Sequence, residues 1–113
     1  MGNPFRKPVT MLRPPAGQYV DGRWTEGAPV ESSILASVQP ASGQDMESLP
    51  EARRTMATYR LYTDTQLYEA LENVRNPDIV VLFGEEYEVV KVFPWRNGVL
   101  EHWKVLASRR QPS

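Results

Sequence analysis

The side chain best suited to acid–base chemistry is that of His102, the single histidine of the chain. A histidine can take up or release a proton near neutral pH. His102 lies between Glu101 and Trp103 in a strand-like stretch, where alternation points it away from both neighbours. No serine, cysteine or acid accompanies it in a catalytic pattern. The sequence therefore predicts no catalytic residue and no enzyme, and His102 is interpreted as a core or inter-subunit hydrogen-bonding residue.

An acidic run, Glu85, Glu86 and Glu88, is the nearest approach to a metal site. It lacks the oxygen-rich loop with a central glycine that calcium sites use. The chain has no cysteine and one histidine, which excludes thiolate and multi-histidine metal sites as well as disulfides. Glycines at intervals of five residues, Gly17, Gly22 and Gly27, open no helix and form no phosphate loop. We predict no metal and no cofactor, and interpret the acidic run as a solvated face or a contact for a basic partner.

Basic and aromatic residues offer candidates for partner contacts. Arg53 and Arg54 lie in a long polar excursion, where paired guanidinium groups either grip a carboxylate or phosphate or are simply solvated. Trp24, close to a turn, is the best candidate for an interface anchor. The basic residues of the N-terminal stretch complete this set of subunit or partner contacts: Arg6, Lys7 and Arg13.

Charge is distributed unevenly along the 113 residues, which are enough for one domain. Residues 1–16 hold three basic side chains and no acid, and residues 109–113 hold two. The body, residues 17–108, has eight basic and fourteen acidic side chains and so carries a net charge of -6. An acidic body argues against a general nucleic-acid binder. No apolar stretch is long enough to span a membrane, and the N-terminus lacks the apolar region of a secretory signal.

The elements that position these residues are mostly strands. Residues 1–16, with four prolines, are predicted to be extended and to add little to the core, either as a disordered leader or as a basic arm that orders on a partner. Asp21-Gly22 predicts a tight hairpin within residues 17–27. Alternation predicts strands over 33–39, 55–63, 79–83, 86–95 and 99–107, with turns at Gly84-Glu85 and Asn97-Gly98. The first strand ends at Pro40, and a long loop over about 41–55 contains one helical turn at 50–54.

The segment from Thr63 to Pro77 has two interpretations. Thr63-Asp-Thr-Gln66 fits a capping box before Leu67, Leu71 and Val74, which predicts a helix, and an irregular connection is the alternative. The pattern as a whole predicts a mainly β fold: a small antiparallel β-barrel or sandwich with a long inserted loop, a short helix and an extended N-terminal arm. Residues 17–108 form the single domain, and residues 109–113 form a basic tail.

A series of short phrases resembles the small head-tail joining proteins of tailed bacteriophages, also called head-completion, head-closure, stopper or connector proteins. The likeness covers residues 17–108. The phrases, in order, are Gly22-Arg-Trp-Thr-Glu-Gly27, Ala36-Ser-Val-Gln-Pro40, Leu49-Pro-Glu-Ala-Arg-Arg54, Leu61-Tyr-Thr63, Gly84-Glu-Glu-Tyr-Glu-Val89 and Trp95-Arg-Asn-Gly-Val-Leu-Glu-His-Trp103. One departure concerns Ala52, where members of that family often have glycine.

This resemblance implies a homo-oligomeric ring in the neck of a virion, assembled in the bacterial cytoplasm. The ring would bind the portal or its adaptor on the head side and the tail terminator or tail tube on the other. Genomic double-stranded DNA would pass through its lumen without sequence-specific binding. The long loop would line or plug the channel, with Gln44, Asp45, Glu47 and Glu51 as the channel-loop candidates.

Two other functions stay open at this point. One is a tail terminator or minor tail ring protein, which shares the barrel architecture. The other is a small nucleic-acid-binding barrel that uses Tyr59, Tyr62 or Trp95 as stacking platforms. For a joining protein, deletion of residues 1–16 is predicted to leave the barrel folded and abolish joining. Replacement of Arg53 and Arg54 by alanine is predicted to weaken assembly without lowering the thermal midpoint.

Overall fold

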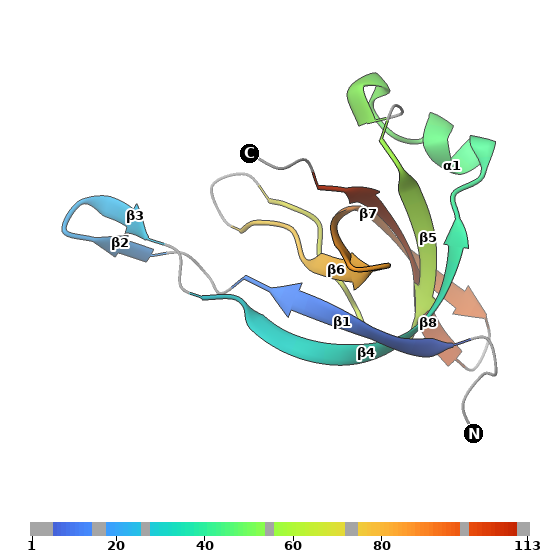
Figure 1. Cartoon of the computed structure of the whole chain (residues 1–113), viewed down its shortest axis with the longest axis horizontal. Coiled ribbons are helices and arrows are strands. Elements are labelled where there is room, and N and C mark those ends of the chain that lie inside the picture. The colour runs from blue at the N-terminus through green and yellow to red at the C-terminus, as the bar shows by residue number, and fades with distance from the viewer. Residues whose placement is uncertain are drawn as a thin grey trace.

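Six strands close into an antiparallel barrel in the computed structural model, which describes residues 6–14, 18–25, 28–53, 56–71, 75–97 and 100–110 (Figure 1). Their order around the barrel is β1-β4-β5-β8-β7-β6. The bounds are β1 (Lys7–Arg13), β4 (Val30–Pro40), β5 (Thr58–Thr63), β6 (Ile79–Leu82), β7 (Glu85–Asn97) and β8 (Leu100–Arg109). A separate hairpin consists of β2 (Gln18–Val20) and β3 (Arg23–Thr25). The predicted mainly β fold is confirmed, and of the two predicted forms the barrel is the observed one.

The interior of the barrel is a packed apolar core. Alternate side chains of each strand point inward, as the period of a β-strand requires. Leu61, Val80, Val89 and Val105 are at most 1% exposed. The other buried members of this cluster are Val9, Met11, Ile34, Ala36, Leu67, Leu82, Tyr87 and Ala107. Because apolar side chains fill the barrel, contacts with other molecules must use its outer surface and its ends.

Two hairpins turn on pairs of residues with positive φ. Asp21 and Gly22 have φ of 52° and 78°, and Phe83 and Gly84 have φ of 53° and 78°. Positive φ at both central residues is the signature of the two-residue turn that matches the twist of paired strands. The Asp21-Gly22 turn is confirmed. The second turn lies one residue earlier than predicted, since β6 ends at Leu82 and Phe83 belongs to the turn.

A β-bulge in β7 changes which side chains face the core. Val89 pairs with Ala107, but Lys91 pairs with Leu106, so Val90 is an extra residue in the ladder. After the bulge Val92 packs against the core. Unbroken alternation over the predicted strand 86–95 would put Lys91 and Phe93 on the face of Val89, and the bulge breaks this alternation after Val89. β7 and β8 form the predicted hairpin, but Asn97 is the last residue of β7 and pairs with Leu100, so it lies in the strand and not in the turn; Gly98 lies outside the described residues.

The N-terminal stretch is not an arm outside the domain. Residues 7–13 are barrel strand β1, which pairs with β4 along its whole length and with β6 from Thr10 to Leu12. Val9 and Met11 are 6% and 3% exposed, so β1 contributes to the core. The expectation that deletion of residues 1–16 leaves the barrel folded is wrong for this reason. At the other end, β8 continues to Arg109, which pairs with Tyr87, so the basic tail begins inside the barrel.

The segment after β5 is the irregular connection rather than the helix. Among its described residues the regular pairing is a single bridge between Leu71 and Arg75. The Thr63 hydroxyl accepts from the Thr65 N–H at 3.2 Å and donates to the backbone oxygen of Leu35 at 2.8 Å, but the described residues that follow it form no helix. The Tyr68 N–H donates to the Asp78 carboxylate at 2.8 Å, and the Asp78 N–H donates to the Tyr68 oxygen. Distant partners thus take the backbone and side-chain groups that a helix would use.

Candidate functional site

The described residues of the long insertion between β4 and β5, 41–53 and 56–57, contain two short helical pieces. They are the α-helix α1 (Gly43–Glu47) and the 3₁₀-helix η1 (Glu51–Arg53). Ser42 caps α1: its hydroxyl accepts from the Asp45 N–H at 3.1 Å, and the Asp45 carboxylate accepts from the Ser42 N–H at 2.9 Å. This reciprocal capping box is a local signal that the sequence contains and that the loop prediction overlooked. The predicted helical turn at 50–54 is confirmed by η1.

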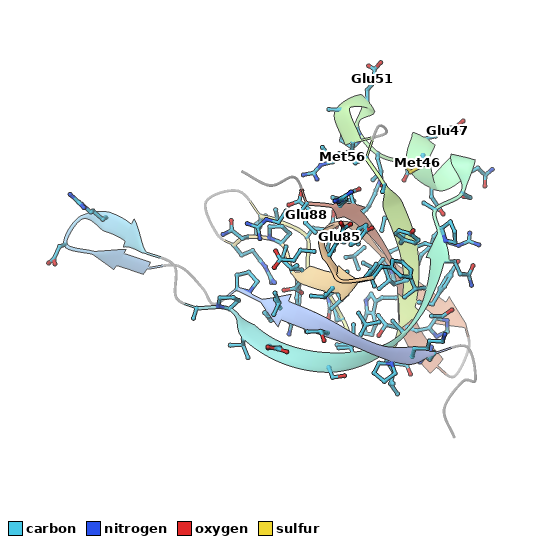
Figure 2. The ribbon with its side chains drawn as sticks, viewed as in Figure 1. Met46, Glu47, Glu51, Met56, Glu85 and Glu88 are labelled. Atoms are coloured by element: carbon cyan, nitrogen blue, oxygen red, sulfur yellow. The ribbon has the colours of Figure 1, made fainter. Side chains whose placement is uncertain are left out.

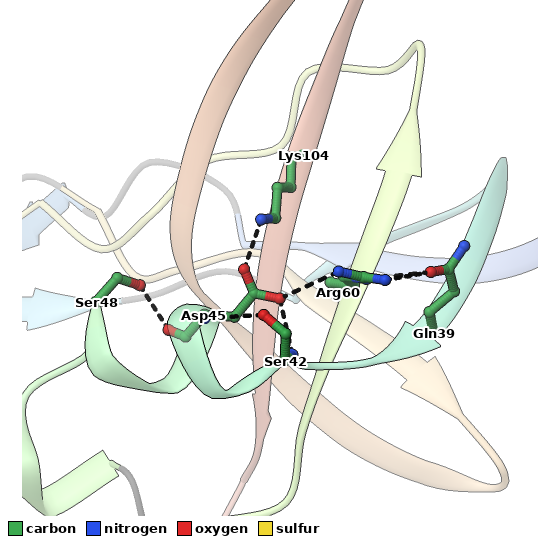
Figure 3. A network of polar contacts seen from close by, with 6 residues as sticks. All are labelled: Gln39, Ser42, Asp45, Ser48, Arg60 and Lys104. Atoms are coloured by element: carbon green, nitrogen blue, oxygen red, sulfur yellow. Dashed lines mark hydrogen bonds and ion pairs between the residues drawn. The ribbon is translucent and has the colours of Figure 1, made fainter.

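Asp45 joins the insertion to the outer face of the barrel (Figure 3). Its side chain is 5% exposed, and its Oδ1 accepts from Lys104 Nζ of β8 at 2.5 Å. Its Oδ2 lies 3.7 Å from Nη1 of Arg60 in β5, whose guanidinium also donates to the Gln39 side chain at 2.7 and 3.1 Å. One carboxylate therefore ties α1 to two neighbouring strands.

The ionisation of Asp45 is the basis of this tie. Burial alone would disfavour the charged carboxylate. The hydrogen bonds from Lys104 and from the backbone and hydroxyl of Ser42 outweigh burial, with a further contribution from the Lys104 charge, and lower the pKa of Asp45 below its ordinary value. Asp45 is thus an anion at neutral pH, held between two cations.

Strand β7 provides the second line of attachment. Lys91 Nζ donates to the backbone oxygen of Ser48 at 3.0 Å, and Arg53 of η1 forms an ion pair with Glu88. Glu85 and Glu86, the other members of the acidic run, pair with Arg109 at 2.7 Å and Arg110 at 3.4 Å. The acidic run is therefore neutralised largely within the chain, and the insertion is fixed across the outer face of β5, β8 and β7.

The channel-loop candidates divide into two groups. Asp45 is buried against the barrel, so the expectation that its side chain lines a channel is wrong for the isolated chain. Gln44, Glu47 and Glu51 are exposed. Figure 2 shows Glu47 and Glu51 on the outer side of the insertion, pointing away from the barrel. The insertion thus presents two carboxylates from a base that Asp45 holds in place.

The basic contact candidates lie mostly in ion pairs within the chain. Arg6 pairs with Asp64, and this hydrogen bond, aided by the Arg6 charge, lowers the pKa of the Asp64 carboxyl against a smaller opposing effect of burial. Arg13 pairs with Asp78 at 3.2 Å. Lys7 is exposed at the beginning of β1. Arg54 and the side chain of Trp24 lie outside the described part of the chain, so their predicted contacts stay predictions.

Asp78 is a buried charged residue that sequence reasoning missed. Its side chain is fully buried, and its carboxylate lies 3.2 Å from Arg13 Nη2 and 3.5 Å from Arg75 Nη2. Both guanidinium groups also lie over the ring of Tyr68, at 5.0 and 4.1 Å from its centroid. Asp78 therefore locks the irregular connection to the end of β1. An aspartate next to a buried strand was visible in the sequence, but its partners are far away along the chain.

His102 lies in the wall of a surface cleft of about 500 Å³. The cleft is also lined by Tyr68, Glu69, Pro94 and Trp103. Its described lining contains no serine, threonine or cysteine that the imidazole could activate. Nowhere in the described ranges do three or more potential metal-ligating side chains gather into a cluster. Within the same ranges, no helix has both the length and the apolar character needed to cross a bilayer.

No family model and no curated protein matches the chain. The assignment of a function therefore depends on the geometry above and on the order of phrases in the sequence.

Proposed function

We propose that this chain is a structural protein of the tailed-phage neck. Copies of it form a ring that joins the DNA-filled head to the tail and lines or closes the DNA channel. The observation that carries the proposal is the insertion between β4 and β5, whose residues 41–53 are fixed on the outside of a filled barrel. Such an element presents the same exposed groups, Glu47 and Glu51, at the same angle in every copy of a ring.

The distribution of charge supports a channel through which DNA slides. The body carries a net charge of -6, and like charge suppresses binding to phosphates. Many arginines are already paired with carboxylates within the chain, which leaves fewer cations for nucleic acid. The arginines in such pairs are Arg6, Arg13, Arg53, Arg60, Arg75, Arg109 and Arg110. This pairing favours the joining function over the nucleic-acid-binding barrel.

Electron microscopy of lysates tests the proposal directly. The gene is deleted from the phage or prophage that encodes the chain, and the wild-type gene on a plasmid serves as the control that restores infectivity. Full or leaking heads beside free tails of normal length are the expected result. Overlong tails would assign the chain to the tail terminus instead, and intact infectious virions would refute a role in the neck.

Charge reversal on the insertion tests the channel separately from assembly. Glu47→Lys and Glu51→Lys are combined in one variant, and Glu31→Lys, also exposed but on β4, is the matched control. Because new cations in a channel would hold phosphates, we expect assembled particles that eject DNA slowly, more so at low salt. DNA ejection as fast as in the control variant would show that the insertion does not line the channel.

A further inference from the structure

The hairpin of β2 and β3 stands apart from its own barrel. It forms a two-stranded sheet of its own, and Figure 1 shows it projecting from one end of the molecule. Asp21, Gly22 and Arg23 at its tip are exposed. An isolated two-stranded hairpin is marginally stable in water, so a surface that covered this hairpin would stabilise it.

A small pocket opens at the opposite end of the β1–β4 pair. The hairpin leaves the barrel where Arg13 pairs with Val30, whereas the pocket lies where Lys7 pairs with Ala36. It exists because β1 pairs with β6 only from Thr10 to Leu12, so the two strands diverge before that point. Its volume is about 260 Å³, and its walls include Lys7, Val9, Val38, Leu82 and Phe83.

Phe83 makes this pocket unusual. It is 75% exposed, although it is a large apolar side chain. Its φ of 53° belongs to the two-residue turn that it forms with Gly84, which holds the ring at the end of β6. Its ring leans on Tyr59, with 5.2 Å between the centroids, and so forms a wall beside the pocket. An exposed aromatic ring on the wall of a pocket offers an apolar contact to another molecule.

The hairpin tip carries a carboxylate that can pair with a cation on the pocket rim, although residues 18–25 as a whole are neutral because Arg23 balances Asp21. Lys7 on the pocket rim and Asp21 at the hairpin tip are both exposed, and neither has an ion pair within the described part of the chain. The backbone register of the hairpin pairs Tyr19 with Trp24, the residue that the sequence predicts to be an interface anchor. Each copy thus has a projecting hairpin at one end of the β1–β4 pair and an open pocket at the other end.

We propose that the β2–β3 hairpin of one copy seats in the Lys7–Phe83 pocket of the next copy in the ring. A contact between two different surfaces of identical chains is heterologous, and it repeats from copy to copy until the ring closes. The proposal rests on the proposed function, which supplies the ring, and adds to it the surfaces through which neighbouring subunits bind.

Cysteine cross-linking in purified particles tests this contact. The natural chain has no cysteine, so Asp21→Cys with Lys7→Cys introduces the only two thiols. Oxidation is expected to give a ladder of linked subunits on a non-reducing gel, and Glu51→Cys with Lys7→Cys is the control that gives none. Assembled particles without a ladder would overturn the hairpin contact and leave the neck function intact. Absence of the wild-type chain from purified virions would instead overturn the neck function.

Charge exchange gives a second test if the thiols disturb assembly. Asp21→Lys alone and Lys7→Asp alone each bring like charges together, and we expect each to lower phage titre at least about tenfold. The double exchange restores the opposite pairing and is expected to recover the titre. If the titre of the double variant is no higher than that of the worse single variant, the pairing of Asp21 with Lys7 is refuted. Trp24→Ala is expected to lower titre too, and an unchanged titre would contradict the apolar part of the contact.

Discussion

Asp45→Asn should loosen the insertion from the barrel while leaving the size of the side chain unchanged. The asparagine keeps an oxygen that can accept from the Ser42 N–H, so the capping of α1 is largely preserved. It removes the charge that pairs with Lys104 at 2.5 Å and Arg60 at 3.7 Å. These two cations are 19% and 29% exposed, so each is left partly buried without its counter-ion.

The expected loss follows from the burial of the carboxylate. An exposed ion pair contributes about 0.2–1 kcal/mol, whereas a hydrogen bond to a charged group contributes about 1.5–3 kcal/mol. Asp45 is 5% exposed, and we therefore expect a loss near the middle of the second range, about 2 kcal/mol. For a chain of this length the entropy of unfolding is about 0.24 kcal/mol/K, so the thermal midpoint should fall by about 8 °C.

Thermal unfolding followed across pH measures both the size and the cause of this effect. The lowered pKa of Asp45 means that its ionisation stabilises the fold above the unfolded value, about 3.9, and that this contribution is lost as pH falls through the folded pKa. The difference in thermal midpoint between wild type and variant should stay constant from about pH 7 to pH 5 and become smaller below about pH 4.

Glu51→Gln removes an exposed carboxylate from the same insertion and is the matched control, expected to change stability by less than about 0.5 kcal/mol. If Asp45→Asn lowers stability no more than this control, the ion pairs of Asp45 contribute little to holding α1 on the barrel. If the difference in thermal midpoint is unchanged at about pH 2.5, the loss of stability comes from packing rather than from charge.

Two further changes test the barrel itself. Deletion of residues 1–13 removes β1, including the buried Val9 and Met11, and should abolish cooperative unfolding as followed by circular dichroism; a sharp, wild-type transition would contradict the assignment of β1 to the barrel. Asp78→Ala leaves two guanidinium groups without their buried counter-ion and should cost about 3 kcal/mol in urea denaturation, because breaking a buried pair from one side is strongly destabilising. A loss below about 1 kcal/mol would show that Tyr68 and solvent satisfy Arg13 and Arg75 equally well.

Local signals in the sequence were enough to predict the hairpins and most strands. Asp21-Gly22 predicts its turn because the turn needs two adjacent residues with positive φ, and Asp and Gly are among the residues that adopt positive φ most readily. The alternation around Ile34 and Ala36 likewise reports a strand with one face in the core. Such features depend on neighbours along the chain, so they can be read without the fold.

The features that sequence reasoning missed depend on distant partners. Prolines suggested that residues 1–16 stay outside the sheet, but Pro8 lies beyond the stretch of β1 that pairs with β6, where a missing N–H is tolerated. The predicted helix after Thr63 gave way to contacts with Asp78. The capping box of Ser42 and Asp45 could be predicted from neighbouring residues. The ion pair between Asp45 and Lys104 could not, because the two residues are far apart in the sequence.

The position of β1 in the barrel has a consequence for the order of folding. β1 bonds to β6, about 70 residues later in the chain, and β5 must wait for β8, the most C-terminal strand of the barrel. No closed barrel can therefore exist on the ribosome until β8 has been made. A truncated product would expose unpaired strand edges, which favours its aggregation or degradation. Only a completed chain can place the hairpin, the pocket and the insertion in their final relation, so incomplete copies would be kept out of any assembly that requires all three.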